Sequence, residues 1–368
     1  MTYLSLLFCI IITYNVPHEN NEGTYLCGLY LQYYYFMKNK IDIKEEVYKM
    51  DILELADKII NGKRLCREDN TDFFASCDLE KLCTGADRIR KHYMGDRVDM
   101  CAVISGKGGR CPEDCKYCAQ SVFNKTGCDV YDFIPEEEIV RACKEDEKEG
   151  IHRFSIVTAG KALTGEDFKK AVHAYKTMSK ECNIGLCASM GFITKEQLEE
   201  LKEAGVTYYH HNIETSESYF PKICTTHTFG DKLRTLKNVK ETGLKICSGG
   251  IIGMGETLKD RISMAFSLAE AGADSIPVNI LMPVKETPLE AVETLSEPEI
   301  LRTIAMFRYV NPDADIRVAA GRKFFTEGGK KAFLSGASAV ITGNMVTTSG
   351  STTVSMDKKM FGEIGRII

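Results

Sequence analysis

The chain has 368 residues, of which 44% are hydrophobic and 27% are charged, and its net charge is −5. These values indicate a globular protein with one large domain or two ordinary ones. The mildly acidic balance disfavours non-specific binding to nucleic acid, which requires a basic surface. Fifteen cysteines are many for such a chain. They favour metal ligands in a reducing, cytoplasmic compartment over the disulfide framework of short secreted proteins.

An apolar run over residues 4–13 opens the chain. It has the length of a signal-peptide core but lacks a positive flank, and it is shorter than the roughly 20 residues of a membrane span. We therefore expect no membrane association. Residues 14–36 are tyrosine-rich and irregular, whereas Met37 begins an ordinary globular sequence. Our hypothesis is that residues 1–36 form an extension outside the folded domain, and that residues 37–94 form a helical segment with helices over 38–61 and 78–92.

From residue 98 onward, short apolar runs alternate with amphipathic helical patterns. The predicted strands cover residues 98–105, 154–158, 184–189, 207–213, 244–248, 275–281, 316–320 and 339–342. The predicted helices cover residues 136–148, 166–180, 195–204, 231–241, 257–270, 297–309, 327–334 and 354–366. Glycines at 205, 243 and 272 end three of these helices. Eight strand–helix repeats predict an α/β fold, a full (β/α)8 TIM-type barrel over residues 95–350 with N-terminal helices and a C-terminal segment, 351–368.

The loop after the first strand reads GRCPEDCKYCAQS and places Cys111, Cys115 and Cys118 at C-x3-C-x2-C spacing. Thiolates bind iron–sulfur clusters or zinc. Three cysteines leave one iron of a four-iron cluster without a protein ligand, whereas a structural zinc site fills all four positions. The spacing therefore favours a centre that binds a further molecule. From the spacing alone, a zinc site completed by Cys101 or Cys128 remains open.

Polar and thiol groups gather at the carboxyl ends of the predicted strands, where barrels of this type carry their active sites. They are Ser155, Thr158, Cys187, Ser189, His210, Asn212, Glu214, Cys247, Asn279 and Arg317. Each alone has an ordinary explanation, such as a buried thiol or an ion pair. If they all lie inside one barrel, each of these buried polar groups needs a hydrogen-bond partner or a ligand. A second metal centre would satisfy Cys187, Cys247 and Arg317 at once.

At the cysteine loop the sequence resembles the radical S-adenosylmethionine (SAM) enzymes, and the full string GRCPEDCKYCAQS resembles that of the biotin synthases. The resemblance to the biotin synthases extends over about residues 78–365. This resemblance implies a (β/α)8 barrel, a homodimer, and a 4Fe–4S cluster on Cys111, Cys115 and Cys118 whose open iron binds SAM. It implies a reducing partner such as flavodoxin or ferredoxin. The implied reaction converts dethiobiotin to biotin: a radical formed from SAM removes hydrogen, and an auxiliary cluster donates sulfur.

The resemblance further implies that the auxiliary cluster is a 2Fe–2S centre held by three cysteines and an arginine. Cys187, Cys247 and Arg317 match three of these positions, but Ser155 stands where the family has a cysteine. A hydroxyl is a poor iron ligand beside a thiolate. We hypothesise that Cys224, in the loop after the fourth strand, replaces the missing ligand in a cluster of different nuclearity. The alternative is that Cys224 is a bystander thiol.

The same resemblance assigns the remaining site residues. SAM binding falls to Tyr117, Asn212, Glu214, Lys232, Gly250 and Gly253, and dethiobiotin binding to Asn212, His210, Asn279 and Thr347. His210 and Lys232 depart from the asparagine and arginine usual in the family, but each keeps a polar group in place.

Two rival interpretations remain open at this point. One is a related radical SAM barrel of the hydrogenase-maturation or methylornithine-forming type, which does not donate sulfur. The other is a zinc- or iron-storing scaffold without enzymatic activity, which would not cleave SAM. The serine at position 155 keeps the first of these in contention.

Overall fold

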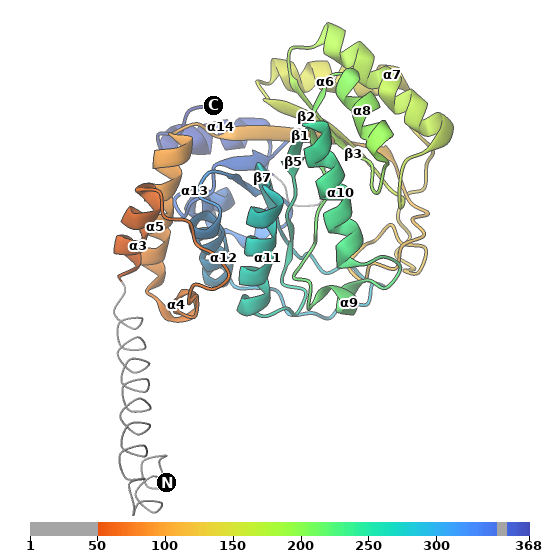
Figure 1. Cartoon of the computed structure of the whole chain (residues 1–368). Helices are drawn as coiled ribbons and strands as arrows, with labels where there is room; N and C mark the ends of the chain where they lie inside the picture. Colours follow the sequence, from red (N-terminus) through yellow and green to blue (C-terminus); the bar gives the residue numbers. More distant parts are fainter. Residues whose placement is uncertain (1–50, 344–351) are drawn as a thin grey trace, which may run out of the picture. The chain divides into compact units, whose positions relative to one another are not determined.

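The computed structural model of the chain describes residues 51–343 and 352–368, in which a ring of parallel strands is surrounded by helices (Figure 1). The strand order is β5-β4-β3-β2-β1-β9-β8-β7-β6, and every pairing is parallel. A further pairing between β5 and β7 closes the ring. Counting β5 and β6 as one interrupted strand, this is the eight-stranded (β/α)8 barrel expected from the sequence, although β6 (Gly250–Ile252) lies beyond the predicted fifth strand, 244–248.

All eight predicted strands are present. They are β1 (Asp99–Lys107), β2 (Arg153–Thr158), β3 (Gly185–Ser189), β4 (Val206–His210), β5 (Lys245–Cys247), β6 (Gly250–Ile252), β7 (Ser275–Ile280), β8 (Asp315–Val318) and β9 (Ala339–Ile341). The fifth strand is interrupted at Ser248 and Gly249, where the chain passes very close to β7. A β-carbon on Gly249 would lie 1.9 Å from the carbonyl oxygen of Pro277, so only glycine fits there.

The outer layer consists of the predicted helices. They are α6 (Glu136–Lys148), α7 (Gly165–Glu181), α8 (Lys195–Glu203), α10 (Phe229–Thr242), α11 (Leu258–Ala271), α12 (Glu297–Val310) and α14 (Val354–Glu363). Thr194, Thr228 and Thr257 begin three of them with reciprocal capping boxes. Gly243 and Gly272 end two of them in the left-handed conformation, as predicted. These local signals explain why the helix bounds were readable from the sequence.

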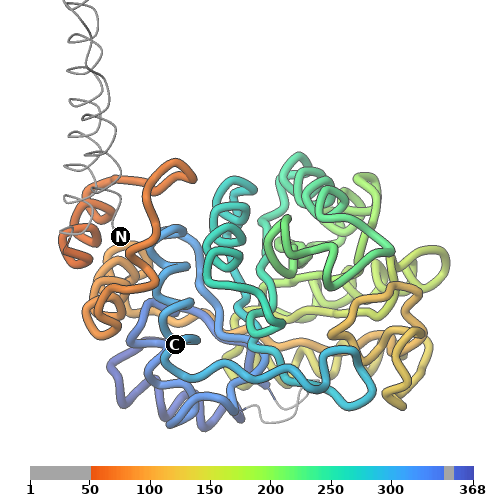
Figure 2. The backbone as a smooth tube through the Cα atoms, turned by 90° about the horizontal axis from the view of Figure 1, so that it is seen from below, coloured from red at the N-terminus to blue at the C-terminus, as the bar shows by residue number. Residues whose placement is uncertain are grey.

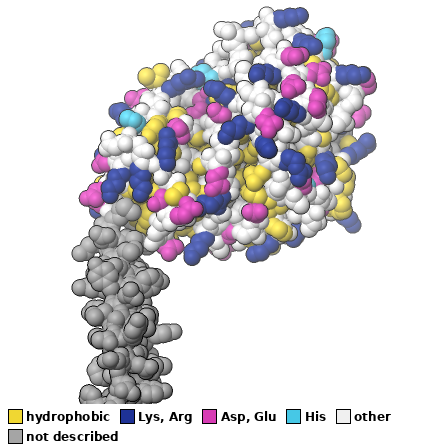
Figure 3. Space-filling model, in the orientation of Figure 1, with side chains coloured by type: hydrophobic (Ala, Val, Ile, Leu, Met, Phe, Trp, Pro, Cys, Tyr) yellow, Lys and Arg dark blue, Asp and Glu magenta, His cyan; other side chains and the backbone are white. Residues whose placement is uncertain are grey.

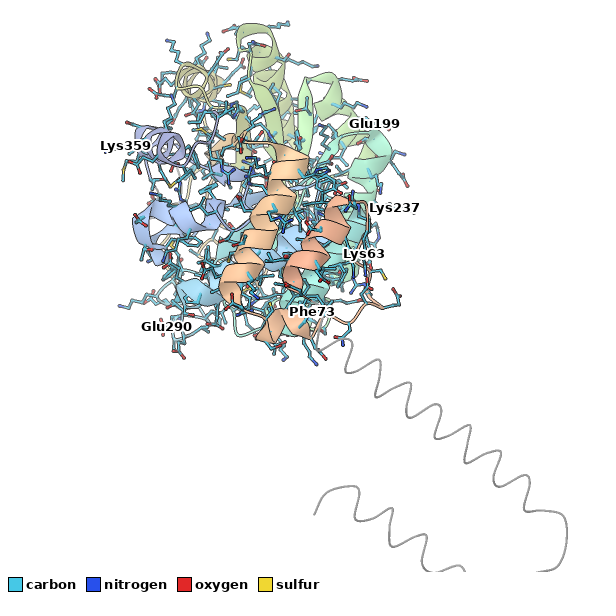
Figure 4. The ribbon with its side chains drawn as sticks, turned by 90° about the vertical axis from the view of Figure 1, so that its left-hand side faces the viewer. Lys63, Phe73, Glu199, Lys237, Glu290 and Lys359 are labelled. Atoms are coloured by element: carbon cyan, nitrogen blue, oxygen red, sulfur yellow. The ribbon has the colours of Figure 1, made fainter. Side chains whose placement is uncertain are left out.

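Three N-terminal helices cover one flank of the barrel: α3 (Ile52–Ile60), α4 (Phe73–Ser76) and α5 (Leu79–Met94) (Figure 4). The Tyr309 hydroxyl of α12 joins them to the barrel by donating to the Ile52 carbonyl at 2.9 Å. The C-terminal residues return to this flank (Figure 2), where Arg366 donates to Asp87 at 2.7 Å. The predicted helix over 38–61 is described only from Ile52, and the proposed extension 1–36 lies outside the described residues.

The predicted helix over residues 327–334 is wrong in its first half. Two 3-10 turns, η1 (Arg322–Phe324) and η2 (Thr326–Gly329), precede a single α-helical turn, α13 (Lys330–Phe333). Glu327 and Gly328 have φ values of 49° and 64°, which an α-helix does not accommodate. The consecutive glycines of this segment allow that reversal. A short helix that was not predicted, α9 (Phe220–Ile223), follows β4.

The surface in Figure 3 carries basic and acidic side chains interspersed, without a face-wide patch of one sign. Within the described ranges, we find no helix with the length and apolar character that crossing a membrane requires. The mixed charge of this face agrees with a sequence in which acidic and basic residues are nearly balanced.

A substitution at Gly85 tests the packing of α5 against α12. A β-carbon there would lie 1.9 Å from the Tyr309 hydroxyl oxygen, so Gly85→Ala should overpack the contact and cost about 1–3 kcal/mol of unfolding free energy. Gly362→Ala in α14 is the matched control, because nothing lies within 4 Å of its added carbon. It should stabilise by about 0.5–1 kcal/mol. Denaturant titration measures both, and an equal effect of the two changes would contradict the packing.

Candidate active site

A cavity of about 640 Å³ lies where the carboxyl ends of several strands meet the cysteine loop. Its lining includes Ser105, Tyr117, Cys118, Asn212, Glu214 and Asn279. The volume is that of a small-molecule site. The cavity therefore joins residues of the cysteine loop to strand-end residues that the sequence analysis had singled out separately.

Hydrogen bonds join the two ends of the cysteine loop. The Cys111 N–H donates to the Gln120 carbonyl at 3.0 Å, and the Val122 N–H donates to the Cys111 carbonyl at 2.9 Å. The Asn124 side chain donates to the Cys118 carbonyl at 2.8 Å. Both ends of the C-x3-C-x2-C segment are therefore fixed without using any thiol, which leaves the thiols available as ligands.

Glu214 is held in a strained backbone conformation at the cavity wall. Its φ is 71°, an uncommon value for a residue with a side chain. Its carbonyl accepts from the Ile251 N–H at 2.8 Å, and a β-carbon on Gly250 would lie 2.4 Å from that carbonyl oxygen. Asn212 also holds the segment after β4 against the Gly249–Ile251 segment, because its side-chain oxygen accepts from the Gly249 N–H at 3.0 Å. Strain of this kind is typical of functional sites, and here it directs Glu214 at the cavity.

One oxygen of the Glu214 carboxylate, Oε2, is buried and has no hydrogen-bond partner among the described residues. Burial raises the pKa of the carboxyl group, and the nearby Lys232 ammonium opposes that rise. A buried acceptor without a partner is costly, so a bound molecule with a donor group would be favoured here.

A layer of thiols lies deeper in the barrel. Cys101 on β1 and Cys187 on β3 are both buried, and the Cys187 thiol holds the pKa of the Cys101 thiol below its ordinary value. The Cys247 sulfur lies 3.4 Å from Nδ1 of His210. Burial lowers the pKa of His210 to about 4, which leaves its ring neutral beside this thiol. Three soft donors thus share the barrel interior.

Ser155 lies in the same layer but has no partner. It is in register with Val103 on β1 and with Cys187 on β3. Its hydroxyl oxygen is buried and makes no hydrogen bond among the described residues. Ser155 therefore offers a buried hydroxyl, next to Cys187, that is free to contact a bound group.

An ion network closes the barrel beneath the thiols. The Asp99 carboxylate accepts from Arg317 Nη2 at 2.6 Å and from Arg153 Nε at 3.0 Å. Burial raises the pKa of Asp99, but the two guanidinium groups outweigh it and hold that pKa below its ordinary value. Arg317 also donates to the Ser275 hydroxyl at 3.2 Å and to the Val340 carbonyl at 2.8 Å. All three Arg317 nitrogens are therefore hydrogen-bond donors.

Cys224 lies at the cysteine loop instead. Its sulfur is 3.8 Å from the Cys115 sulfur and 3.2 Å from Oδ1 of Asp114. The loop after β4 brings it there, because the Lys116 N–H donates to the carbonyl of Ile223 at 2.9 Å. This placement favours Cys101 over Cys224 as the thiol that compensates for Ser155. Sequence reasoning considered Cys101 only as a zinc ligand for the loop.

Comparison with known proteins identifies the family. Residues 107–268 match the radical SAM superfamily, and residues 277–367 match the biotin and thiamin synthesis associated domain. The biotin synthase of Clostridium beijerinckii is 56% identical over 312 residues, which are 85% of this chain and 98% of that protein. The biotin synthase of Alkaliphilus metalliredigens is 52% identical over 316 residues, 86% of this chain and 99% of that protein. The chain belongs to the biotin synthase family.

A solved structure of methylornithine synthase has a TM-score of 0.73 to this biotin synthase family member at 21% identity, over 85% of this chain and 96% of that one. A sequence identity of 21% supports a shared barrel fold but not a shared function. It does not favour the rival interpretation as a methylornithine-forming enzyme, because the sequence relatives at more than twice that identity are biotin synthases.

The residues of this biotin synthase family member fit the groups that the family implies. The loop thiols are soft donors at the edge of the cavity, as a 4Fe–4S cluster with an iron open to SAM requires. The unpartnered Glu214 oxygen suits a donor group of SAM, and the unpartnered Ser155 hydroxyl lies in the inner thiol layer. The inner thiols suit a second iron–sulfur cluster.

The structure also locates the other predicted residues. Lys232 is buried, with its ammonium 4.9 Å from the centre of the Phe192 ring. The Gly253 N–H donates to Glu256 at 2.8 Å, so that carboxylate braces the glycine loop. Thr347 lies outside the described residues. Sequence reasoning missed Asp99 and Arg153, whose only signal is a charged residue at the start of a buried strand.

We expect Asp99→Asn to destabilise the barrel by about 3–5 kcal/mol, because it leaves the buried Arg317 guanidinium without a counter-charge, whereas Arg153 keeps its ion pair with Asp315 at 3.0 Å. Asp313→Asn is the control, since the Arg64–Asp313 ion pair is exposed. Breaking that pair should cost less than about 1 kcal/mol. Denaturant unfolding of the two variants measures the difference. Equal costs would show that the buried network does not hold the barrel.

The same network predicts a dependence on pH. Because the pKa of Asp99 is lowered on folding, its contribution is fully present above its unfolded pKa of about 3.9. It is lost as the pH falls through the lower, folded pKa. The wild type should therefore lose more stability than Asp99→Asn between about pH 4 and pH 2. Parallel acid titrations of the unfolding midpoint would detect this, and identical curves would contradict it.

Proposed function

We propose that the chain converts dethiobiotin to biotin by a radical SAM reaction with insertion of sulfur. The proposal is supported by 56% identity to a biotin synthase over 98% of its length. The observation that carries it structurally is a pair of thiol sets at different depths, one at the cavity edge and one beneath it. A reaction that joins a radical generator to a sulfur donor needs such a separation, with substrate between the two.

Cys111, Cys115 and Cys118 would hold a 4Fe–4S cluster, and the inner thiols would hold an auxiliary cluster. When bound, the first supplies the electron that cleaves SAM and the second supplies sulfur. The chain itself contributes placement. Asn279 donates to the Gly250 carbonyl at 3.1 Å and accepts from the Ala320 N–H at 3.2 Å. These bonds hold it rigidly at the cavity wall for contact with dethiobiotin.

SAM binding is proposed for the other side of the cavity. Glu214 and Asn212 lie on the strand-four side, and Tyr117 lies in the cysteine loop. The Glu214 oxygen without a partner would accept from a hydroxyl or ammonium group of SAM. Lys232 stays buried behind this wall and supplies a compensating positive charge. These residues orient SAM and exclude water, which protects a reactive species from side reactions.

We further propose that Cys101, Cys187 and Cys247 are the thiol ligands of the auxiliary cluster, in place of the set that included Cys224. Cys101 lies in the same interior layer as Cys187, on the strand next to the one that carries Ser155. Arg317 would then act as a charged neighbour of the cluster, since its nitrogens already donate to other groups. The proposed set has three thiols and no arginine ligand, whereas the family set has three thiols and an arginine. This difference is consistent with a cluster other than 2Fe–2S.

We also propose that the enzyme works in the cytoplasm as a homodimer and receives electrons from a flavodoxin or ferredoxin. The cysteines of the described residues are free thiols, which a reducing compartment preserves.

The reaction is tested by anaerobic reconstitution of the full chain with iron and sulfide, followed by incubation with SAM, a reductant and dethiobiotin. Mass spectrometry should detect biotin, together with methionine and 5′-deoxyadenosine. SAM cleavage without biotin would support a radical SAM enzyme with another substrate and would overturn the proposed function. Omitting dethiobiotin is the control for unproductive cleavage.

A thiol exchange tests the auxiliary ligand set. Cys101→Ser should lower the iron and sulfide content by the amount of the inner cluster and reduce biotin formation by at least about tenfold. Cys224→Ser should leave the inner iron in place, because its sulfur lies at the cysteine loop. The reverse result would return Cys224 to the inner set.

A double variant separates loss of a ligand from loss of packing. Cys101→Ser with Ser155→Cys restores the number of inner thiols on adjacent strands. We expect it to recover iron content above that of Cys101→Ser, measured by chemical analysis and by the visible absorption of the cluster. If Cys101→Ser alone kept full iron content, Cys101 would not be a ligand.

A further inference from the structure

One cluster of metal-ligating side chains in the described ranges shares only Cys115 with the proposed iron–sulfur ligands. Cys115, Cys224 and His227 place one ligand atom each within 4.8 Å of one another. Cys224 and His227 come from the loop between α9 and α10, and Cys115 comes from the cysteine loop. Cys224 and His227 are buried, so the cluster is shielded from bulk water.

The spacing of these atoms is that of ligands to one metal ion. The two sulfurs are 3.8 Å apart, and the Cys224 sulfur is 3.7 Å from Nε2 of His227. A tetrahedral ion with metal–sulfur bonds near 2.3 Å and metal–nitrogen bonds near 2.0 Å requires separations of about 3.8 Å and about 3.5 Å. Thiolates on two different irons of a cubane lie further apart, since an iron–iron edge separates them. The pair therefore suits a mononuclear ion.

The His227 ring lies beside the Cys224 sulfur, with Nδ1 at 3.3 Å and Nε2 at 3.7 Å. Its Nδ1 atom contacts the buried carboxylate of Glu113. That carboxylate also accepts from the Thr226 hydroxyl at 2.7 Å and lies 3.4 Å from the Lys161 ammonium. A carboxylate on one ring nitrogen commonly fixes the other for metal binding. Phe192 packs edge-on against the His227 ring at 4.9 Å between centroids.

No fourth side chain from residues 51–343 or 352–368 joins this group of ligand atoms. Asp114 Oδ1 lies 3.2 Å from the Cys224 sulfur, but it already accepts from the N–H groups of Thr225 and Thr226 at 2.8 and 3.1 Å. Three protein ligands and one water are a common arrangement for zinc.

We propose that the chain without its iron–sulfur cluster binds one zinc-type divalent cation through Cys115, Cys224 and His227. Both thiols lose their protons on binding, and the fourth position takes water. Because Cys115 belongs to both sets, the ion and the 4Fe–4S cluster exclude each other. The site would therefore hold the cysteine loop in a metal-bound, cluster-free form and would delay assembly of the cluster until the ion leaves. This inference goes beyond the proposed reaction and concerns the chain before it is active.

The test uses the full chain, freed of iron and sulfide and kept anaerobic with reduced thiols. Co²⁺ is the probe, since its tetrahedral thiolate complexes absorb visible light, and Zn²⁺ should displace it. We expect one high-affinity ion in the wild type. Cys224→Ser and His227→Gln should each weaken its binding at least tenfold, and Glu113→Gln by about 10–100-fold through the orientation of His227.

Matched variants separate this site from an ordinary three-cysteine site in the loop. Cys115→Ser should abolish the high-affinity absorption, whereas Cys111→Ser and Cys118→Ser should keep it. Cys66→Ser, at an exposed thiol, controls for the other cysteines. Circular dichroism and the thermal midpoint verify that each variant is folded.

A second readout follows assembly directly. Zinc loaded before reconstitution should slow the appearance of cluster absorption in the wild type but not in Cys224→Ser. Unchanged Co²⁺ affinity in both Cys224→Ser and His227→Gln would overturn the proposal. So would an equal loss in Cys111→Ser, Cys115→Ser and Cys118→Ser. Dethiobiotin turnover plays no part in these measurements, so failure here is distinct from failure of the proposed reaction.

Discussion

The interior of the barrel depends on the compensation of buried charge by Asp99. Its carboxylate joins the guanidinium groups of Arg153 and Arg317 and thereby ties β1 to β2 and β8 at the closed end. Arg317 could not otherwise lie inside the barrel, because an unpaired buried charge costs several kcal/mol, whereas Arg153 also pairs with Asp315. Their positive charge in turn suits a layer of thiolates directly above. The ion network thus fixes both the closure of the barrel and the kind of group that its interior can hold.

The parallel register turns this arrangement into two levels. Side chains two or four residues apart on a strand point to the same side, so each strand contributes one residue to the lower level and another nearer the mouth. On β1 these are Cys101 and Ser105, and on β7 they are Ser275 and Asn279. The cavity is lined by Ser105 and Asn279 but by none of the inner thiols. A substrate in it would lie between the loop thiols above and the inner thiols below, which is the order that radical formation followed by sulfur transfer requires.

The sequence predicted the fold well because its signals are local. Capping threonines and helix-ending glycines are visible within four residues, and strand alternation needs only a short window. The failures have non-local causes. The break at Gly249 comes from the carbonyl of Pro277 on another strand, and the helix expected from Glu327 gives way to two glycines in left-handed conformations. The partners of Asp99 are 54 and 218 residues away, a separation that no short pattern reports.

The ligand sets show the same limit. In the sequence, Ser155 departs from the family pattern. The replacement that we hypothesise from the sequence is Cys224, in a loop near the barrel mouth. In the folded chain a ligand set is a property of a layer, and a layer draws on neighbouring strands regardless of their distance in sequence. Cys101 is 54 residues before Ser155 but lies on the adjacent strand, in register with Arg153. Cys224 is drawn to the cysteine loop by a backbone hydrogen bond from Lys116 to Ile223. The strand or loop that a cysteine is paired with therefore decides which side chains surround it, and Cys101 and Cys224 lie in different surroundings for that reason.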